Sequence, residues 1–310
     1  MTTNSDKIKQ LREKTGAGML DCRDALTENN GDIEASIIWL RKKGVASASK
    51  KSSRVASDGL VGSINNTKLC CLCEINTETD FVSKNQEFQT FFQKILEKAI
   101  ESKINLEELL KLEYSQGSNI EEALKDLIAK IGENIVIRRL SYLELDNENQ
   151  LFGKYMHNKI TDNLGKIGCF VKAECSTEKV QSIELLKKIA MHVSASRPQG
   201  LDKEDISSVL LEKERDIFRD QLRNEGKSED IIENIIKGKI NKFLTETTLL
   251  NQKWIMDTSL SVKEVVKNFN NEHNSDLQIK SFNLFVLGEG VEVVEKNFAE
   301  EVASQMNDSS

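Results

Sequence analysis

The sequence predicts an α+β fold in which small antiparallel sheets are backed by helices. One observation is the apolar run Leu69–Ile75, which is typical of a buried strand and is followed by a helix with apolar residues at helical spacing. A second is that this strand and helix occur twice, because Lys68–Cys73 matches Lys166–Val171 at an offset of 98 residues. A third is that further helical patterns precede the two copies, interrupt the second copy and follow it. Together they favour a duplicated α+β core with added helical units.

An N-terminal unit, residues 1–45, is predicted to contain three short helices. Turns are expected at Thr15–Gly18, where glycines break a helix, and at Asn29–Gly31, after which Asp32 can cap the third helix. The apolar faces of these helices comprise Ile8, Leu11, Met19, Cys22, Ala25, Leu26, Ile33, Ile37 and Leu40. So small a core indicates either a helical cap docked on the main domain or a recognition module that presents one helix face to a partner.

Residues 46–55 are predicted to be a linker at the end of the basic, small-residue stretch Arg41–Arg54. A tail that binds nucleic acid and a solvated tether are both compatible with this composition. The tether is favoured, because no aromatic residues are interspersed among the charges to stack on bases.

The duplicated core is predicted to comprise residues 56–145 and 146–290. A turn-broken apolar stretch precedes the strand in each copy, Gly59–Ser63 in the first and Leu151–Tyr155 in the second. One further strand follows each helix, at Asn134–Leu140 and at Gln278–Val286. At the 98-residue offset the apolar positions of the two helices pair as Phe88 with Leu186, Phe91 with Ile189, Phe92 with Ala190 and Ile95 with Val193.

Two helical additions complete the predicted architecture. Residues 201–250, inserted in the second copy, are expected to form an antiparallel helical hairpin with its turn at Asn224–Lys227. This hairpin is either a self-supporting buttress or an arm that binds another protein. Residues 291–310 are expected to form a C-terminal helix, which packs on its own domain or reaches a partner. Its predicted apolar face comprises Val291, Val294, Phe298 and Val302.

The candidate functional loop lies in Cys73–Val82, where Asp80 and Phe81 fall between the first strand and its helix. Taken alone, the pattern is typical of a core Phe81 and of an Asp80 that caps the helix. The second copy has Thr177-Glu178-Lys179 where the first has Thr79-Asp80-Phe81. If the two copies share their backbone geometry, the fold does not require an aromatic residue there. Phe81 is therefore predicted to be exposed and to face a partner.

Composition limits the classes of function. The chain has 310 residues and a net charge of −7, and this acidic balance argues against nucleic acid as the main partner. No stretch approaches the roughly 18 apolar residues of a membrane span, and the N-terminus has no apolar run, so a cytoplasmic protein is expected. No disulfide framework is indicated by the spacing of Cys22, Cys70, Cys71, Cys73, Cys169 and Cys175, which are expected to be reduced and buried.

Two apparent chemical motifs are rejected. Gly226-Lys227-Ser228 resembles the end of a phosphate-binding loop, but Gln221 stands where that pattern needs glycine. Cys71 and Cys73 would face the same side of a strand, yet no second Cys/His pair has zinc spacing, so neither a metal nor a cofactor is expected. His192 is expected to be a packed histidine. With no catalytic set in view, a binding protein is favoured over an enzyme.

Motifs along nearly the whole chain resemble the elongation factor Ts family. They are Leu11–Met19 with Asp21-Cys22 and Ala25-Leu26, Asn30-Gly31-Asp32, Arg54-Val55-Ala56 with Asp58-Gly59, Thr79–Val82, Ile131–Ile135 with Arg138-Arg139, Ala190–Val193, and Gly288-Glu289-Gly290. One departure is Lys253-Trp254, where family members often have Pro-Phe. It concerns only the local path of the chain after the hairpin.

The resemblance implies a guanine-nucleotide exchange factor without chemistry of its own. Its partner would be elongation factor Tu, both GDP-bound and nucleotide-free, with no direct contact to nucleic acid or membrane. Residues 1–45 would be a ubiquitin-associated-like domain, and the hairpin a protruding or dimerisation arm, so that a homodimer through the hairpin is one arrangement the family allows. The loop of Thr79, Asp80, Phe81 and Val82 would insert into elongation factor Tu and displace magnesium. Further contacts are implied for Gly16, Ala17, Gly18, Met19 and His157.

A competing hypothesis is a non-catalytic scaffold that binds a GTPase or another partner through the three-helix domain and the hairpin. Such a scaffold would leave the nucleotide state of its partner unchanged. Exchange is favoured by the resemblance and by the difference between Asp80-Phe81 and its counterpart in the second copy.

Overall fold

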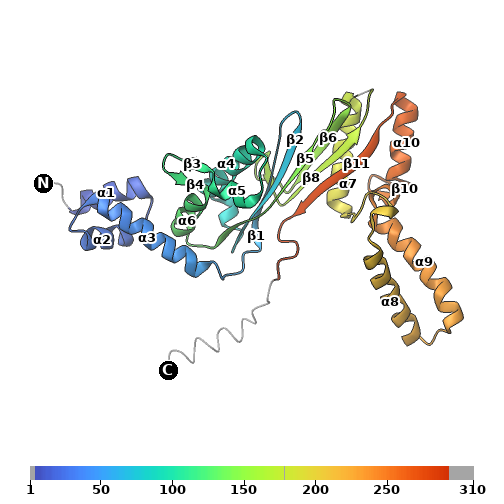
Figure 1. Ribbon diagram of the computed structural model, residues 1–310, viewed down its shortest axis with the longest axis horizontal. Helices are drawn as coiled ribbons and strands as arrows, with labels where there is room; N and C mark the ends of the chain where they lie inside the picture. Colours follow the sequence, from blue (N-terminus) through green and yellow to red (C-terminus); the bar gives the residue numbers. More distant parts are fainter. Residues whose placement is uncertain (1–3, 178, 293–310) are drawn as a thin grey trace.

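The computed structural model describes residues 4–177 and 179–292 and has an α+β architecture (Figure 1). A three-helix unit lies at one end, sheets with covering helices form the middle, and a helical hairpin projects near the other end. The predicted C-terminal helix lies outside the described residues apart from positions 291 and 292. Among the described helices, none combines the length and apolar character needed to cross a membrane.

The N-terminal unit consists of three helices around a small core of Leu11, Cys22, Ala25 and Leu26, as predicted. Asp32 caps the third helix, because its carboxylate accepts a hydrogen bond of 2.9 Å from the backbone N–H of Ala35. The helices are α1 (Asn4–Thr15), α2 (Met19–Glu28) and α3 (Ile33–Lys51).

Helix α3 continues into the stretch that the sequence assigned to a linker, so residues 46–51 are helical and do not form an extended tether. Two contacts explain the extension. Ala48 is buried in the core of the adjacent sheet unit, and Gly44 lies so close to α6 that an added Cβ would be 3.0 Å from Ala129. Packing against the core therefore decides the conformation of this segment, although its charges alone predict a solvated tether.

The two halves of the core repeat one arrangement of strands and one helix. The first sheet has the order β5-β2-β1-β7 and the second β11-β8-β6, and all pairs are antiparallel. In the first half the elements are β1 (Asp58–Asn65), β2 (Leu69–Thr77), the 3-10 helix η1 (Val82–Lys84), α4 (Gln86–Ser102) and β5 (Ile135–Glu144). Their counterparts are β6 (Gln150–His157), β8 (Ile167–Glu174), α7 (Lys179–Ser196) and β11 (Gln278–Val286). The predicted duplication is confirmed by this shared strand order.

Each half also has elements of its own. The first half adds α5 (Leu106–Lys111), β3 (Glu113–Ser115), β4 (Ser118–Asn119) and α6 (Ile120–Ile131). The second half adds β7 (Leu164–Gly165), η2 (Lys203–Asp205), η3 (Leu249–Asn251), β9 (Lys253–Trp254), β10 (Asp257–Ser261) and α10 (Val262–His273). Strand β7 pairs with β1, so the second half extends the first sheet.

The core has three apolar layers because the strands alternate their side chains between two faces. On β2, Cys71 and Cys73 face α4 to α6, whereas Cys70 and Leu72 face the second sheet. On β8, Phe170 faces the first sheet. The remaining face of the second sheet packs against α7 and α10. All six cysteines are free and buried, as expected.

The predicted hairpin is confirmed as α8 (Ser208–Asn224) and α9 (Glu229–Thr247). Its seam is a separate apolar cluster that contains Leu222, Ile232, Ile236 and Ile240. Ser207 caps α8 by accepting a hydrogen bond from the backbone N–H of Leu210. The hairpin therefore has a core of its own and stands off the sheets (Figure 1).

His192 is a packed histidine at the base of this hairpin, as predicted. Its Nδ1 accepts from the backbone N–H of Ile255 at 3.3 Å, so Nε2 carries the proton and donates to Gln252 Oε1 at 2.9 Å. The ring stacks on Trp254 with 5.2 Å between centroids. Burial lowers the pKa of His192 below its ordinary value of 6.5, and the hydrogen bond to Gln252 only partly opposes that shift.

This environment predicts that stability depends on pH. Below about pH 6.5 unfolded His192 binds a proton that the folded imidazole resists, so the free energy of unfolding is expected to decline as the pH falls from 6.5 towards the lowered folded pKa. Urea denaturation at about pH 7.5 and about pH 5.5 measures this decline. A His192→Gln variant should start less stable and lose part of the pH dependence. An unchanged pH dependence in that variant would contradict the assignment.

Candidate functional site

The Thr79–Val82 loop lies between the end of β2 at Thr77 and the start of α4 at Gln86. Phe81 is 75% exposed, as predicted, whereas Val82 is only 4% exposed. Asp80 is also exposed, and Thr79 is half-buried. The loop thus directs two of its four residues outward and uses the other two for support.

The loop is fixed at its base. The backbone N–H and hydroxyl of Thr79 donate to the two carboxylate oxygens of Glu133, at 2.9 and 2.7 Å. The backbone N–H of Asn134 donates to Glu78 Oε1 at 2.6 Å. Beyond the tip, the Ser83 hydroxyl donates to the carbonyl of Asp80. A turn held on both sides presents its exposed residues in a defined position.

The alternative role of Asp80 as the cap of α4 is wrong. Asn85 is the cap, because its side chain accepts from the N–H groups of Glu87 and Phe88 at 2.8 and 3.2 Å. The carboxylate of Asp80 instead lies 3.5 Å from Lys84 Nζ, in an exposed ion pair. Lys84 Nζ also lies 5.8 Å from the centroid of the Phe81 ring. The tip therefore combines an aromatic ring with one charge of each sign.

The second copy differs at this junction more than the sequence comparison assumed. Helix α7 begins at Lys179, the counterpart of Phe81, whereas the first copy inserts η1 before α4. The premise of shared backbone geometry is therefore wrong at this point. The exposure of Phe81 is observed directly and does not depend on that premise.

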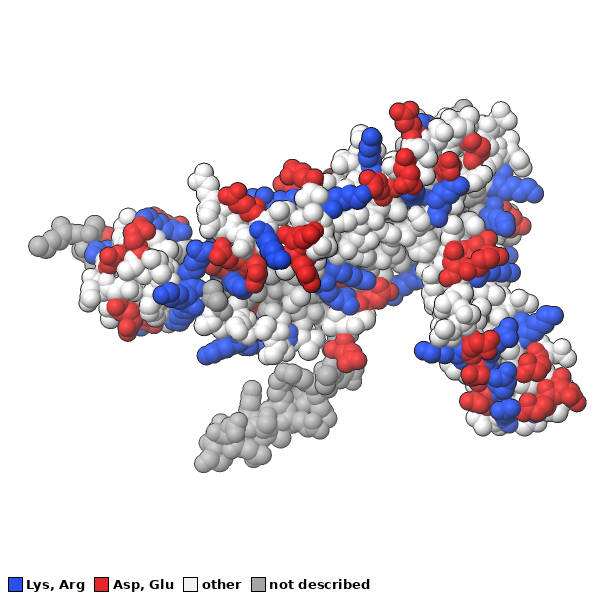
Figure 2. Space-filling view, in the orientation of Figure 1, with Lys and Arg blue, Asp and Glu red and all other residues white. Residues whose placement is uncertain are grey.

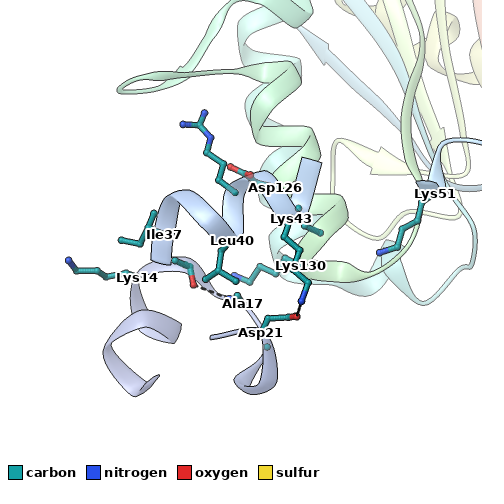
Figure 3. A pocket seen from close by; sticks show the side chains of 14 residues that line it. Lys14, Ala17, Asp21, Ile37, Leu40, Lys43, Lys51, Asp126 and Lys130 are labelled. Atoms are coloured by element: carbon teal, nitrogen blue, oxygen red, sulfur yellow. Dashed lines mark hydrogen bonds and ion pairs between the residues drawn. The ribbon is translucent and has the colours of Figure 1, made fainter. Parts of the chain in front are cut away.

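The predicted contacts Gly16–Met19 form the turn between α1 and α2. Gly16 has φ +68°, a backbone conformation that favours glycine, and an added Cβ would meet only the flexible end of the Lys130 side chain, 2.5 Å away at Cε. Met19 is 60% exposed. A cavity of about 470 Å³ is lined by residues of this turn and of α6, and Lys43 and Asp21 pair beside it at 2.7 Å (Figure 3).

A second groove joins this turn to the helix that follows Phe81. Thr15 of α1 and Glu87 of α4 both line it, and Lys130 pairs with Glu87 at 2.5 Å. Thr15, which directly precedes the predicted N-terminal contacts, thus lines the same groove as the helix that follows the Phe81 loop.

His157, the other predicted contact, is the exposed last residue of β6. Its Nδ1 lies 3.1 Å from the Tyr155 hydroxyl, and its carbonyl accepts from the backbone N–H of Lys166. Since Lys166 Nζ donates to the carbonyl of Gly59 in β1, His157 lies at the seam between the two sheets.

Sequence reasoning missed the residues that support the loop, Glu78, Glu133 and Asn134. It also missed Glu74, which is fully buried on β2 and pairs with Arg138 and Arg139. Glu133 and Asn134 stand directly before β5, so the sequence feature that could have indicated them is a pair of polar residues at the start of a strand. No pattern in the sequence indicated that this start lies beside the end of β2.

Charge on the surface is mixed. Figure 2 shows Lys and Arg interspersed with Asp and Glu on the face in view, most densely on the hairpin. Within the part of the chain that the structure describes, no group of three or more His, Cys, Asp or Glu residues is placed to hold a metal ion.

Fold and site together define a duplicated α+β protein that presents an aromatic residue on a braced surface loop. The family model described as Elongation factor TS matches residues 78–289. The protein named Elongation factor Ts in Rhodospirillum centenum is 42% identical over 298 residues, which are 96% of this chain and 96% of that protein. Those of Rickettsia bellii and Bartonella bacilliformis are 41% and 39% identical and cover 98% of this chain and 97% and 99% of their own. The chain belongs to the elongation factor Ts family.

Proposed function

We propose that this protein binds GDP-bound elongation factor Tu and promotes the release of GDP and its exchange for GTP. The observation that carries the proposal is the exposure of Phe81, 75%, on a turn whose base is fixed by hydrogen bonds. The ring can lose its contact with water only when a partner covers it, and the fixed turn presents it in a defined position, so the arrangement favours a binding role. Family membership supports the choice of partner.

In the proposed mechanism the Asp80-Phe81 tip inserts near the nucleotide site of elongation factor Tu. Magnesium, which belongs to elongation factor Tu, bridges phosphate oxygens and neutralises their charge. An inserted side chain that displaces the magnesium ion therefore weakens GDP binding. Burying one phenylalanine is worth about 1.5–3 kcal/mol, or about tenfold or more in affinity. The negative charge of Asp80 adds repulsion towards the phosphates or engages partner groups near the metal.

The effect is a thermodynamic coupling and needs no covalent step or resident cofactor. If this protein lowers the affinity of elongation factor Tu for GDP, GDP lowers the affinity for this protein by the same factor. GTP then displaces the exchange factor from the nucleotide-free complex. The protein acts as an exchange factor in the cytoplasm and not as an enzyme.

Other parts of the chain would enlarge the interface. The turn Gly16–Met19 offers the exposed Met19, and His157 offers an exposed ring. Residues 1–45 would act as a ubiquitin-associated-like docking domain, with the C-terminal segment 291–310 as a further contact. The hairpin is a candidate arm for a partner or for a homodimer. Nucleic acid and membrane have no part in this function.

The test is the release of a fluorescent GDP analogue from elongation factor Tu after addition of this protein at a small fraction of the GTPase concentration. We expect accelerated release of all the bound analogue. Each molecule of this protein should therefore act on many molecules of elongation factor Tu. Excess GDP should weaken the complex in a separate binding measurement. Binding without any change in the release rate would instead establish the scaffold function.

A further inference from the structure

Two neighbouring loops of the first half brace each other. From the β2–α4 loop, Thr79 donates both its backbone N–H and its hydroxyl to Glu133, at 2.9 and 2.7 Å. From the α6–β5 loop, Asn134 donates its backbone N–H to Glu78 at 2.6 Å. Each loop thus supplies a carboxylate to the other, and hydrogen bonds to a carboxylate are stronger than those between neutral groups. This reciprocal pair is called the brace below.

The brace is supported by the buried residue Asn134 and by a further hydrogen bond to Thr79. Asn134 is 3% exposed, and its side-chain amide donates to the carbonyl of Arg54 at 2.7 Å. The Thr77 hydroxyl donates to the carbonyl of Thr79 at 2.8 Å. Thr79 is therefore held through its N–H, its hydroxyl and its carbonyl, only two residues before Phe81. Such constraints restrict the directions in which the next residues can project.

We propose that Glu133 and Thr79 are positioning residues that set the direction of Phe81 for nucleotide release. The proposal rests on the proposed exchange function. In the free protein the backbone of Phe81 is held, because its carbonyl accepts the N–H of Lys84 at 3.1 Å, whereas its ring is 75% exposed and has Lys84 Nζ 5.8 Å from its centroid. A side chain that must enter a partner gains affinity when its conformation is fixed beforehand. Thr79 and Glu133 therefore act on exchange through the direction of Phe81.

The second copy offers the matched comparison. Asp276 accepts the backbone N–H and the hydroxyl of Ser176, at 2.9 and 2.6 Å. Asp276 stands two residues before β11, as Glu133 stands two residues before β5. The same kind of support thus recurs at a junction that has no exposed aromatic residue. If these hydrogen bonds only supported the fold, removing either set would have the same effect on exchange. If the brace positions Phe81, only its loss slows exchange, and loss of the hydrogen bonds between Asp276 and Ser176 does not.

The experiment measures GDP release from elongation factor Tu at saturating concentrations of the full chain, for Glu133→Ala, Thr79→Val and the control Asp276→Ala. We expect the maximal release rate to fall for the first two variants, by up to the roughly tenfold that removal of the Phe81 ring itself would cost, because they act through that ring. Asp276→Ala should keep the native rate. Thr79→Ser, which retains the hydroxyl and the N–H, should also keep it. Thermal melting checks that each variant is folded. If Glu133→Ala is unfolded, the comparison of Thr79→Val with Thr79→Ser tests the proposal.

A double variant separates positioning from general support. If Glu133 acts through Phe81, Glu133→Ala should lower the rate little further in a Phe81→Ala background. Additive losses, or equal losses in Glu133→Ala and Asp276→Ala, would overturn the proposal. Native release rates in both Glu133→Ala and Thr79→Val, together with a slowed rate in Phe81→Ala, would also overturn the positioning proposal. The exchange function would stand in that case. If the native chain itself fails to accelerate release, the exchange function and with it this proposal are overturned.

Discussion

Replacing Glu74 by alanine is expected to destabilise the protein by about 3–5 kcal/mol, the usual loss when one member of a buried ion pair is removed. Glu74 is fully buried on β2 and accepts from Arg138 at 3.0 Å, from Arg139 at 2.6 Å and from the backbone N–H of Gly288 at 2.9 Å. The variant would leave two guanidinium groups without their buried partner. It would also remove the hydrogen bond that joins Gly288, after the last strand of the second half, to the first half.

Urea denaturation measures this loss, and Glu144→Ala on the neighbouring strand is the matched control. Glu144 pairs with Lys103 at the surface, with its side chain 49% exposed, so its removal should change the free energy of unfolding by about 1 kcal/mol or less. A comparably small loss in Glu74→Ala would mean that water reaches the site, and the account of a buried network would be wrong.

Replacing Gly153 by alanine is expected to cost about 1–3 kcal/mol or more, because β6 and α7 approach each other at this glycine. An added Cβ would lie 2.3 Å from the carbonyl carbon of Leu186 and 2.5 Å from its oxygen. Both atoms belong to the backbone of α7, so the helix itself would have to move. The midpoint of thermal or urea unfolding measures the effect.

Gly238 provides a control with the opposite sign. It lies inside α9, and an added Cβ would meet no atom within 4 Å. Gly238→Ala should therefore stabilise the protein by roughly 0.5–1 kcal/mol through helix propensity. If both variants change stability equally, the contact between β6 and α7 is not tight.

The elements that sequence reasoning found are those that repeat or have strong periodicity. Strand β11 has the bounds predicted from its apolar pattern, Gln278–Val286, and β2 begins at the predicted Leu69. The hairpin turn, residues 225–228, is displaced by only one residue from the predicted Asn224–Lys227. In each case local composition and burial favour the same conformation. The duplication was predicted from one fixed sequence offset, and the shared strand order of the two sheets confirms it.

The features that were missed depend on contacts between distant residues. Helix α3 continues to Lys51 because Ala48 is buried in the core of the sheet unit. The brace joins residues that are 54 positions apart, Thr79 and Glu133. Glu74 lies inside the run Leu69–Ile75 that was predicted to be a buried strand, and its partners Arg138 and Arg139 are 64 and 65 positions away. Periodicity reports which face a residue occupies, but it does not report what lies opposite that face.

The central claim is that the exposed Phe81 drives GDP release, and the rate of release at saturating concentrations of this protein tests it most directly. Phe81→Ala should slow release by about tenfold or more, because burial of the ring supplies about 1.5–3 kcal/mol, and it should leave the melting temperature unchanged. Val180→Ala is the control, since Val180 is 74% exposed in the second copy. Its release rate should equal that of the native protein. A native rate in Phe81→Ala, or an unfolded Phe81→Ala, would contradict the account.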